Sequence, residues 1–303
     1  MNEQISIFEY IGDPRARIYK TNKKIRLIEM FGGIGSQAMA LRDMGADFET
    51  WKLIEYDKYP IASYNAIHGT NYKPMDIRNV HGRDLEIVNK ESFTYLLTYS
   101  FPCQDLSISG LMRGMTKGTS TRSGLLWEVE RILTELKAEY LDLPDILLME
   151  NVPNVHGQGN MKDFREWVDF LNNLGYSSYW QDLNARDYGV AQSRSRCFMV
   201  SILGNWNYKF PKPLKLNKTM KDYLEDKVDE KYYITNEKAK ELIDKLIVNG
   251  KILTDRQTDR QTIDLCNGKP INESSTILTR ERGVCGVENK ESGVVEIGWI
   301  LNR

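Results

Sequence analysis

One cysteine stands where a thiol could act as a nucleophile. The segment SFPCQDLSISG, residues 100–110, places Cys103 directly after Pro102 and behind the apolar run TYLLTYS, residues 94–100. A lone cysteine is most often a small buried hydrophobe, and that interpretation stays open. Cys103, however, follows the expected strand rather than filling it, and the loop around it is polar. An exposed thiol in such a loop can ionise and attack an electrophile.

An acid closes a second apolar run. Glu150 comes near the end of DILLMEN, residues 145–151, and Val152 follows. Burying an unpaired carboxylate is unfavourable, so Glu150 is expected to have a task. A salt bridge or a helix cap would be a purely structural one. Alternatively, burial would raise the pKa of Glu150 and make it a proton donor near neutral pH.

Two arginines, Arg194 and Arg196, precede the apolar run CFMVSI, residues 197–202. Residues at i and i+2 of an extended segment face the same way. Their guanidinium groups could therefore present fixed donors to an anion or to the carbonyl of a nucleobase. A pair of surface arginines is the structural alternative.

A glycine loop follows the first apolar run. FGGIG, residues 31–35, together with Ala38 gives the pattern G-x-G-x-x-A, and Glu55 lies 20 residues after Gly35. Glycines let the backbone turn tightly and approach a ligand closely, and an acid after the second strand can accept hydrogen bonds from ribose hydroxyls. The pattern suits an adenosine-type cofactor, whether nicotinamide or adenosylmethionine. A structural glycine turn is the third interpretation.

The elements that must position these groups alternate between strands and helices. Such alternation predicts an α/β fold with a doubly wound, mostly parallel sheet, in which ligands bind at the carboxyl ends of the strands. The expected strands are residues 25–31, 51–57, 94–100 and 145–151, with a later pair at 177–185 and 196–204; the expected helices are 36–45, 61–67, 125–136 and 164–175.

Composition limits the other classes. Hydrophobic residues make up 41% of the 303 residues, enough for a sizeable core, and 41 basic residues nearly cancel 42 acidic ones. No apolar run approaches the roughly 20 residues of a membrane helix, and the N-terminus does not resemble a signal peptide. The four cysteines form no C-x-x-C pair, and the three histidines do not cluster with them. Neither a disulfide framework nor a zinc site is expected, and a cytoplasmic location fits best.

The chain changes character after about residue 205, where lysines recur without acids between residues 209 and 221. That run is either a solvated linker or an edge that contacts phosphates. We therefore predict an N-terminal extension at 1–24, a catalytic domain at 25–205 and a smaller C-terminal region at 206–303.

The order of the motifs is more specific than any one of them. FGGIG, IEYD, FPCQ, ENV and Q-x-R-x-R occur in this order over roughly residues 25–205. In this the chain resembles the DNA cytosine-C5 methyltransferase family of bacterial or phage type. The resemblance implies a Rossmann-like fold that uses S-adenosylmethionine to methylate C5 of cytosine in a specific double-stranded DNA sequence, with no metal required.

The resemblance also implies catalytic roles. Cys103 would attack C6 of a flipped-out cytosine, and Glu150 would hold and protonate the ring at N3. Arg196 would contact O2 of the same base, with Arg194 supporting the pocket. Ser109 would help to fill the space that the base leaves.

By the same resemblance, Glu55 would bind the cofactor ribose, Tyr56 would pack on adenine, and Asp76 and Ile77 would address the adenine edge. Leu125 would pack near the cofactor. The full set of expected cofactor residues is Phe31, Gly33, Gly35, Glu55, Tyr56, Asp76, Ile77, Pro102 and Leu125, and the expected DNA-contacting residues are Gln104, Ser107 and Ser109.

Residues 206–303 would form the target-recognition region, which we expect to be incomplete at its C-terminal end. The last motifs of the resembled family are not found before Arg303, so we expect a second polypeptide, or the natural continuation of a truncated gene, to supply them. A cognate restriction endonuclease, as in restriction-modification systems, is a further expected partner. The alternatives are a tRNA cytosine methyltransferase, a nicotinamide oxidoreductase, and an inactive or split DNA-binding subunit.

Overall fold

The computed structural model describes residues 17–106, 114–118 and 122–215, with isolated residues and two-residue strands beyond them. The chain divides into two compact units, Met1–Asp182 with Arg196–Phe210, and Leu183–Ser195 with Pro211–Arg303. The predicted boundary between a catalytic domain and a C-terminal region, after residue 205, stays a prediction.

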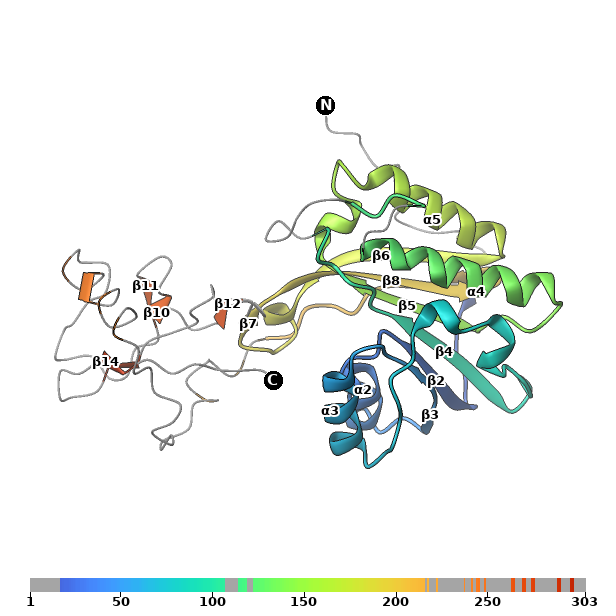
Figure 1. Ribbon diagram of the computed structural model, residues 1–303, viewed down its shortest axis with the longest axis horizontal. Helices are drawn as coiled ribbons and strands as arrows, with labels where there is room; N and C mark the ends of the chain where they lie inside the picture. Colours follow the sequence, from blue (N-terminus) through green and yellow to red (C-terminus); the bar gives the residue numbers. More distant parts are fainter. Residues whose placement is uncertain are drawn as a thin grey trace. The chain divides into compact units, whose positions relative to one another are not determined.

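Within the described residues, one six-stranded sheet forms the centre of the first unit, in the order β3-β2-β4-β5-β8-β6 (Figure 1). β2 is parallel to β3 and β4, β4 is parallel to β5, and β8 runs antiparallel to β5. This arrangement confirms the predicted α/β fold with a mostly parallel sheet. The strands are β2 (Lys24–Met30), β3 (Phe48–Ile54), β4 (Phe93–Tyr99), β5 (Ile146–Asn151), β6 (Tyr176–Asn184) and β8 (Ser195–Leu203).

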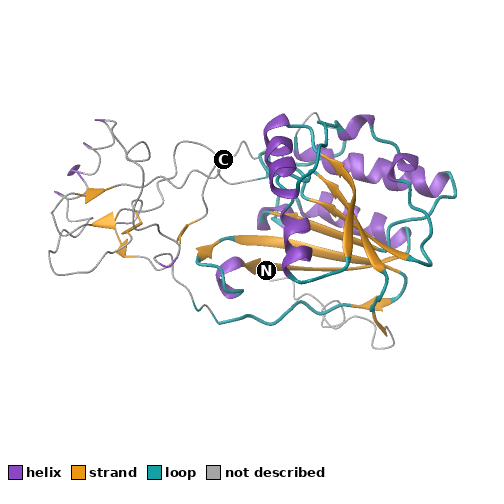
Figure 2. Cartoon of the chain, turned by 90° about the horizontal axis from the view of Figure 1, so that it is seen from below, coloured by secondary structure: helices purple, strands orange, loops and turns teal. Residues whose placement is uncertain are grey.

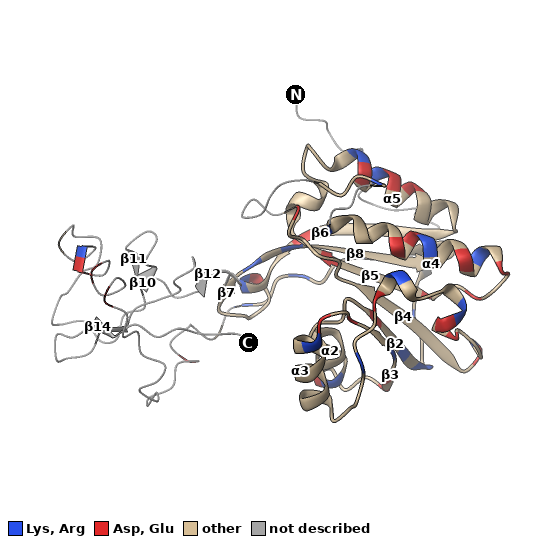
Figure 3. Ribbon diagram, in the orientation of Figure 1, with Lys and Arg blue, Asp and Glu red and all other residues tan. Residues whose placement is uncertain are grey.

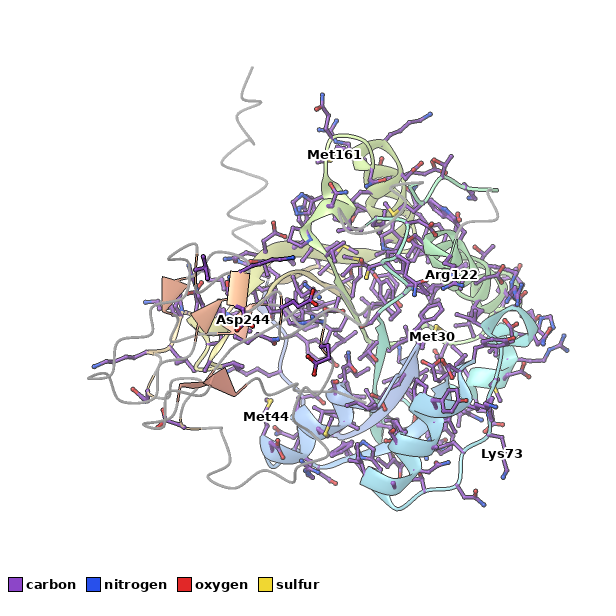
Figure 4. All side chains as sticks on the ribbon, turned by 60° about the vertical axis from the view of Figure 1, so that its left-hand side comes forward. Met30, Met44, Lys73, Arg122, Met161 and Asp244 are labelled. Atoms are coloured by element: carbon purple, nitrogen blue, oxygen red, sulfur yellow. The ribbon has the colours of Figure 1, made fainter. Side chains whose placement is uncertain are left out.

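Helices cover both faces of the sheet (Figures 1 and 2). α2 (Ser36–Asp43) and α3 (Lys58–His68) lie on one side, and α4 (Leu126–Ala138) and α5 (Met161–Asn173) lie on the other. Parallel strands that are covered on both faces read as nearly continuous apolar runs, as these do. Met30, at the end of β2, accordingly lies in the interior (Figure 4).

The main hydrophobic core lies under α4 and α5. Trp167 of α5 meets the ring of Tyr99 on β4 at a centroid distance of 5.6 Å. On α4, Val129, Leu133 and Leu136 are buried, and their spacing of three to four residues puts them on one face of the helix. Charged residues recur along the rest of α4 and α5 (Figure 3). A smaller cluster joins Leu53 of β3 to Ile61 and Tyr64 of α3.

The predicted elements are present, with shifted ends. The strand expected at 51–57 is wrong in its bounds, because β3 ends at Ile54 and leaves Glu55 in a loop. There the main-chain carbonyl of Glu55 accepts a hydrogen bond from Met75 N at 2.7 Å, and Asp57 caps α3 by accepting from Tyr59 N at 2.9 Å. The polar residues after β3 thus make hydrogen bonds within the loop and at the start of α3 instead of extending the strand.

None of the helices in the described part of the chain has the length and apolar character that crossing a bilayer requires.

Short elements lie between and beyond the larger ones. The 3₁₀ helices are η1 (Ile77–Asn79), η2 (Gly82–Leu85), η3 (Ser123–Leu125), η4 (Pro153–His156) and η5 (Ala185–Asp187). The two-residue strands are β1 (Arg17–Ile18), β7 (Gln192–Ser193), β9 (Trp206–Asn207), β10 (Ile263–Asp264), β11 (Lys269–Pro270), β12 (Ser274–Ser275), β13 (Glu288–Asn289) and β14 (Val295–Glu296).

Candidate active site

Cys103 lies in the loop that follows β4. Its thiol is half-buried and, within the described residues, belongs to no disulfide. Its carbonyl accepts a hydrogen bond from Leu106 N at 3.0 Å, which closes a turn around the cysteine. The thiol is therefore held at the carboxyl edge of the sheet, where ligands of doubly wound folds bind.

A buried aspartate anchors this loop. Asp105 is 6% exposed, and its carboxylate accepts a hydrogen bond from Arg122 N at 2.8 Å. Ser123 donates its hydroxyl to the carbonyl of Pro102 at 2.7 Å, and the guanidinium of Arg122 donates to the side chain of Gln104. The segment that leads into α4 thus fixes the loop on both sides of Cys103. The other predicted DNA-contacting residues, Ser107 and Ser109, lie outside the described residues.

The end of β5 is tied to the same loop by two asparagines. The amide of Asn151, which is 2% exposed, donates to the carbonyl of Phe101 at 3.0 Å. The amide of Asn154 donates to the carbonyl of Leu106 at 2.6 Å. The two polar segments that follow adjacent parallel strands are therefore joined directly.

Glu150 forms an ion pair with Arg196. Arg196 Nε lies 3.0 Å from Glu150 Oε1, and their side chains are 15% and 24% exposed. The Glu150 carboxylate lies near the end of β5 and is partly exposed. The salt bridge that the sequence left open is present, and its partner is the second arginine of the predicted pair.

Arg194 belongs to the second unit. Its backbone N–H donates to the side-chain oxygen of Asn184 at 3.0 Å, and its carbonyl accepts from Ala185 N at 3.0 Å. Both bonds hold the short extended segment in front of β8. Hydrogen bonds of its main chain thus fix the position of the Arg194 backbone.

The glycine loop turns sharply between β2 and α2. Phe31 has φ 57°, Gly33 φ 55° and Gly35 φ 82°, all in the left-handed region. A non-glycine residue is uncommon there, and Phe31 is held by a hydrogen bond from its N–H to the carbonyl of Ile54 at 2.7 Å. The loop therefore passes close to the end of β3.

The two later glycines of the loop differ in what surrounds them. A Cβ on Gly35 would lie 2.4 Å from His68 and 2.6 Å from Tyr64, so its glycine is required by packing. A Cβ on Gly33 would meet nothing within 4 Å. Gly33 thus presents backbone to open space, as a residue that a ligand approaches should do.

Glu55 lies beside this open backbone. Its carboxylate accepts hydrogen bonds from Gly33 N at 3.0 Å and from Asp57 N at 2.9 Å. The neighbouring ring of Tyr56 is 71% exposed. The structure therefore gathers a fixed carboxylate, a bare backbone turn and an exposed aromatic ring at the ends of β2 and β3.

The segment of Asp76 is brought next to them by the Met75–Glu55 backbone bond. Ile77 is buried, and Asp76 caps η1 while its carboxylate pairs with Arg78 at 2.5 Å. Hydrogen bonding to that guanidinium lowers the pKa of Asp76. The Asp76 carboxylate thus already has a partner in Arg78. Leu125, the last predicted cofactor residue, lies at the end of η3 and is half-buried.

Three residues that the sequence did not single out shape the site: Asp105, Arg122 and Asn154. Asp105 follows the cysteine motif by two positions, and a single acid in a polar loop carries no spacing signal. Its partner Arg122 comes 17 residues later, so only the folded loop shows their connection.

Comparisons with known proteins find related sequences over most of the chain. Residues 25–281 match the model of the family described as C-5 cytosine-specific DNA methylase. The chain is 33% identical over 260 residues to the type II methyltransferase M2.ScrFI of Lactococcus lactis subsp. cremoris, covering 70% of this chain and 71% of that protein. It is 32% identical to the orphan methyltransferase M.SssI of Spiroplasma monobiae, covering 73% and 70%.

Among solved structures, the S. pombe Dnmt2 methyltransferase superposes with a TM-score of 0.56 at 22% identity. That match covers 76% of this chain and 67% of the other, and it supports the fold.

Proposed function

Because the chain belongs to the C-5 cytosine-specific DNA methylase family, we propose that it transfers a methyl group from S-adenosylmethionine to C5 of cytosine within a specific DNA sequence. The reaction proceeds through a covalent bond between Cys103 and C6 of a flipped-out base. The observation that carries this proposal is the junction of the Cys103 loop with the end of β5, where Glu150 pairs with Arg196.

The chain's own residues fit an adenosine-type cofactor. Gly33 offers open backbone, Glu55 offers a carboxylate that two N–H groups already orient, and Tyr56 offers an exposed ring. Gly33 thus leaves room for the cofactor, the Glu55 carboxylate accepts hydrogen bonds from ribose hydroxyls, and the Tyr56 ring stacks on the adenine. When bound, S-adenosylmethionine supplies the methyl group.

Cytosine C5 is a weak nucleophile, so the base must be activated. The Cys103 thiolate forms a bond to C6, and the electron pair of the C5=C6 double bond moves to C5. Glu150 stabilises the ring by a hydrogen bond and a proton at N3. After C5 is methylated, loss of the C5 proton restores the double bond and expels the Cys103 thiolate.

The target base must leave the duplex, at a cost of a few kcal/mol. Arg196, which pairs with Glu150, donates to O2 of the flipped base. Arg194 supports the pocket, and Gln104, Ser107 and Ser109 contact the DNA. We assign target recognition to the region after residue 205.

Bisulfite sequencing tests the proposal. Host DNA from cells that express the full chain should contain unconverted cytosine at one defined sequence, and DNA from cells that express Cys103→Ser should not. A parallel measurement of labelled S-adenosylmethionine and NAD binding separates the proposal from a nicotinamide enzyme. Methylation confined to tRNA, or binding of NAD in place of S-adenosylmethionine, would overturn the assignment.

A further inference from the structure

Three potential metal ligands converge in the first unit, next to the strand ends that carry Glu150 and Arg196. They are His156 at the end of η4, Asp182 on β6 and Cys197 on β8. One ligand atom from each lies within 4.8 Å of the others, and His156 Nε2 is 2.9 Å from Asp182 Oδ1. The proposed methyl transfer uses none of the three.

The cluster has a closed side and an open side. Cys197 is fully buried and pairs across the antiparallel ladder with Asn151. The side chains of His156 and Asp182 are 27% and 40% exposed. An ion could therefore enter from solvent past the imidazole and the carboxylate and reach the sulfur at the back.

The cluster sets a carboxylate beside a thiol that can ionise to a thiolate. Both groups are anionic once the thiol has lost its proton. A divalent ion would compensate both the thiolate and the carboxylate, and its binding would release the thiol proton.

The donor set also indicates the kind of ion. Sulfur, imidazole nitrogen and carboxylate oxygen are the ligands of zinc-class transition metals. Calcium and magnesium prefer oxygen alone. Three protein ligands leave the fourth tetrahedral position to water.

We propose that His156, Asp182 and Cys197 bind a divalent transition-metal ion of the zinc class. The ion would clamp η4 to β6 and β8. η4 follows directly after the β5 end that carries Glu150 and includes Asn154, the residue that holds the Cys103 loop. The site is thus a structural clamp behind the candidate active site and stands independently of the methyl-transfer proposal.

Cobalt spectroscopy of the full chain tests this site, because Co²⁺ replaces Zn²⁺ and reports a bound thiolate. The measurement uses a variant with three substitutions, Cys103→Ser, Cys266→Ser and Cys285→Ser. Cys197 is the one cysteine that remains in this variant. Titration with Co²⁺ should give a thiolate-to-cobalt charge-transfer band that saturates at one equivalent, and Zn²⁺ should abolish it. Calorimetry in buffers of different ionisation enthalpy should show release of a proton.

Two variants supply the controls. Cys197→Ser in the otherwise unchanged chain should lose the charge-transfer band. Asp182→Asn, at a partly exposed position, should weaken Co²⁺ binding by more than about tenfold, with unchanged circular dichroism. A band that survives Cys197→Ser, Co²⁺ binding that Asp182→Asn leaves unchanged, or failure of the Cys197-only protein to bind Co²⁺ while folded would show that the cluster is a hydrogen-bonded triad without a metal.

Discussion

Arg196 Nε lies 3.0 Å from Glu150 Oε1, where β8 runs antiparallel to β5 in the central sheet. The strand that reverses direction therefore brings a guanidinium to the carboxyl end of a parallel strand. Under the proposed function, a base that enters the site would share Glu150 with Arg196, and the two side chains would together fix where the ring binds.

Glu150→Gln keeps the side-chain volume and removes the transferable proton. General acid catalysis contributes roughly 10²–10⁴-fold, so the single-turnover rate of methyl transfer should fall by that order. The affinity for S-adenosylmethionine should not change. Glu139→Gln, at an exposed position after α4, is the matched control and should retain the wild-type rate. An unchanged rate in Glu150→Gln would make Glu150 structural.

Glu55→Ala should weaken cofactor binding. The carboxylate would no longer meet the ribose hydroxyls, and the loss of such a charged acceptor costs about 1–3 kcal/mol, or roughly 5- to 150-fold in Kd. Calorimetry with S-adenosylmethionine measures it. Asp57→Asn, on the same loop, changes a helix cap and should leave Kd unchanged. Equal affinity of Glu55→Ala and wild type rejects the ribose role.

Asn151→Ala removes the hydrogen bond that ties β5 to the loop of Cys103. The carbonyl of Phe101 would be left buried without its donor, which costs about 1–3 kcal/mol of unfolding free energy. Denaturant unfolding should show this loss, and kcat should fall more than the cofactor Kd changes. The exposed Asn173→Ala serves as the comparison. If stability and kcat both stay at wild-type values, the bond does not position the loop.

Glu29 predicts a pH dependence of stability. Burial raises its pKa to about 7, although Tyr64 donates a hydrogen bond to it at 2.7 Å. Its Oε1 has no hydrogen-bond partner among the described residues. The folded protein therefore keeps a proton that the unfolded chain releases near pH 4.5.

The stability from this proton is complete below about pH 4.5 and is lost as pH rises to about 7, a total of about 3 kcal/mol. Glu29→Gln should lack this slope, so the difference in unfolding free energy between wild type and variant should change across that window. A constant difference from pH 4.5 to 7 would show that Glu29 does not titrate as the fold implies.

The sequence was sufficient for the sheet and for the placement of the main chemical groups. Apolar runs followed by polar residues put Cys103 after β4 and Glu150 near the end of β5. Adjacent parallel strands end at the same edge of the sheet, so the two residues come to the same edge. The sequence was insufficient for the contacts between distant segments. Asp105 with Arg122 and Glu150 with Arg196 are side-chain pairings, which depend on loop paths and on the reversed direction of β8.

Glu29 shows a different limit. It sits inside an apolar run that was correctly assigned to a strand, and a single acid does not interrupt that pattern. A charged residue at the centre of a buried parallel strand was nevertheless a usable signal of a buried hydrogen-bonded group. The gathering of His156, Asp182 and Cys197 had no such signal, because the three residues are widely spaced along the chain and form no short ligand motif.

The central claim is that Cys103 forms a covalent bond to the target base. DNA that carries 5-fluorocytosine at the recognised sequence blocks the loss of the C5 substituent, so the adduct cannot resolve. With S-adenosylmethionine present, the wild-type chain should become covalently attached to this DNA, and peptide mapping should place the bond on Cys103. Cys103→Ser should form none. An adduct on Cys197, Cys266 or Cys285, or methyl transfer by Cys103→Ser at the wild-type rate, would contradict the account.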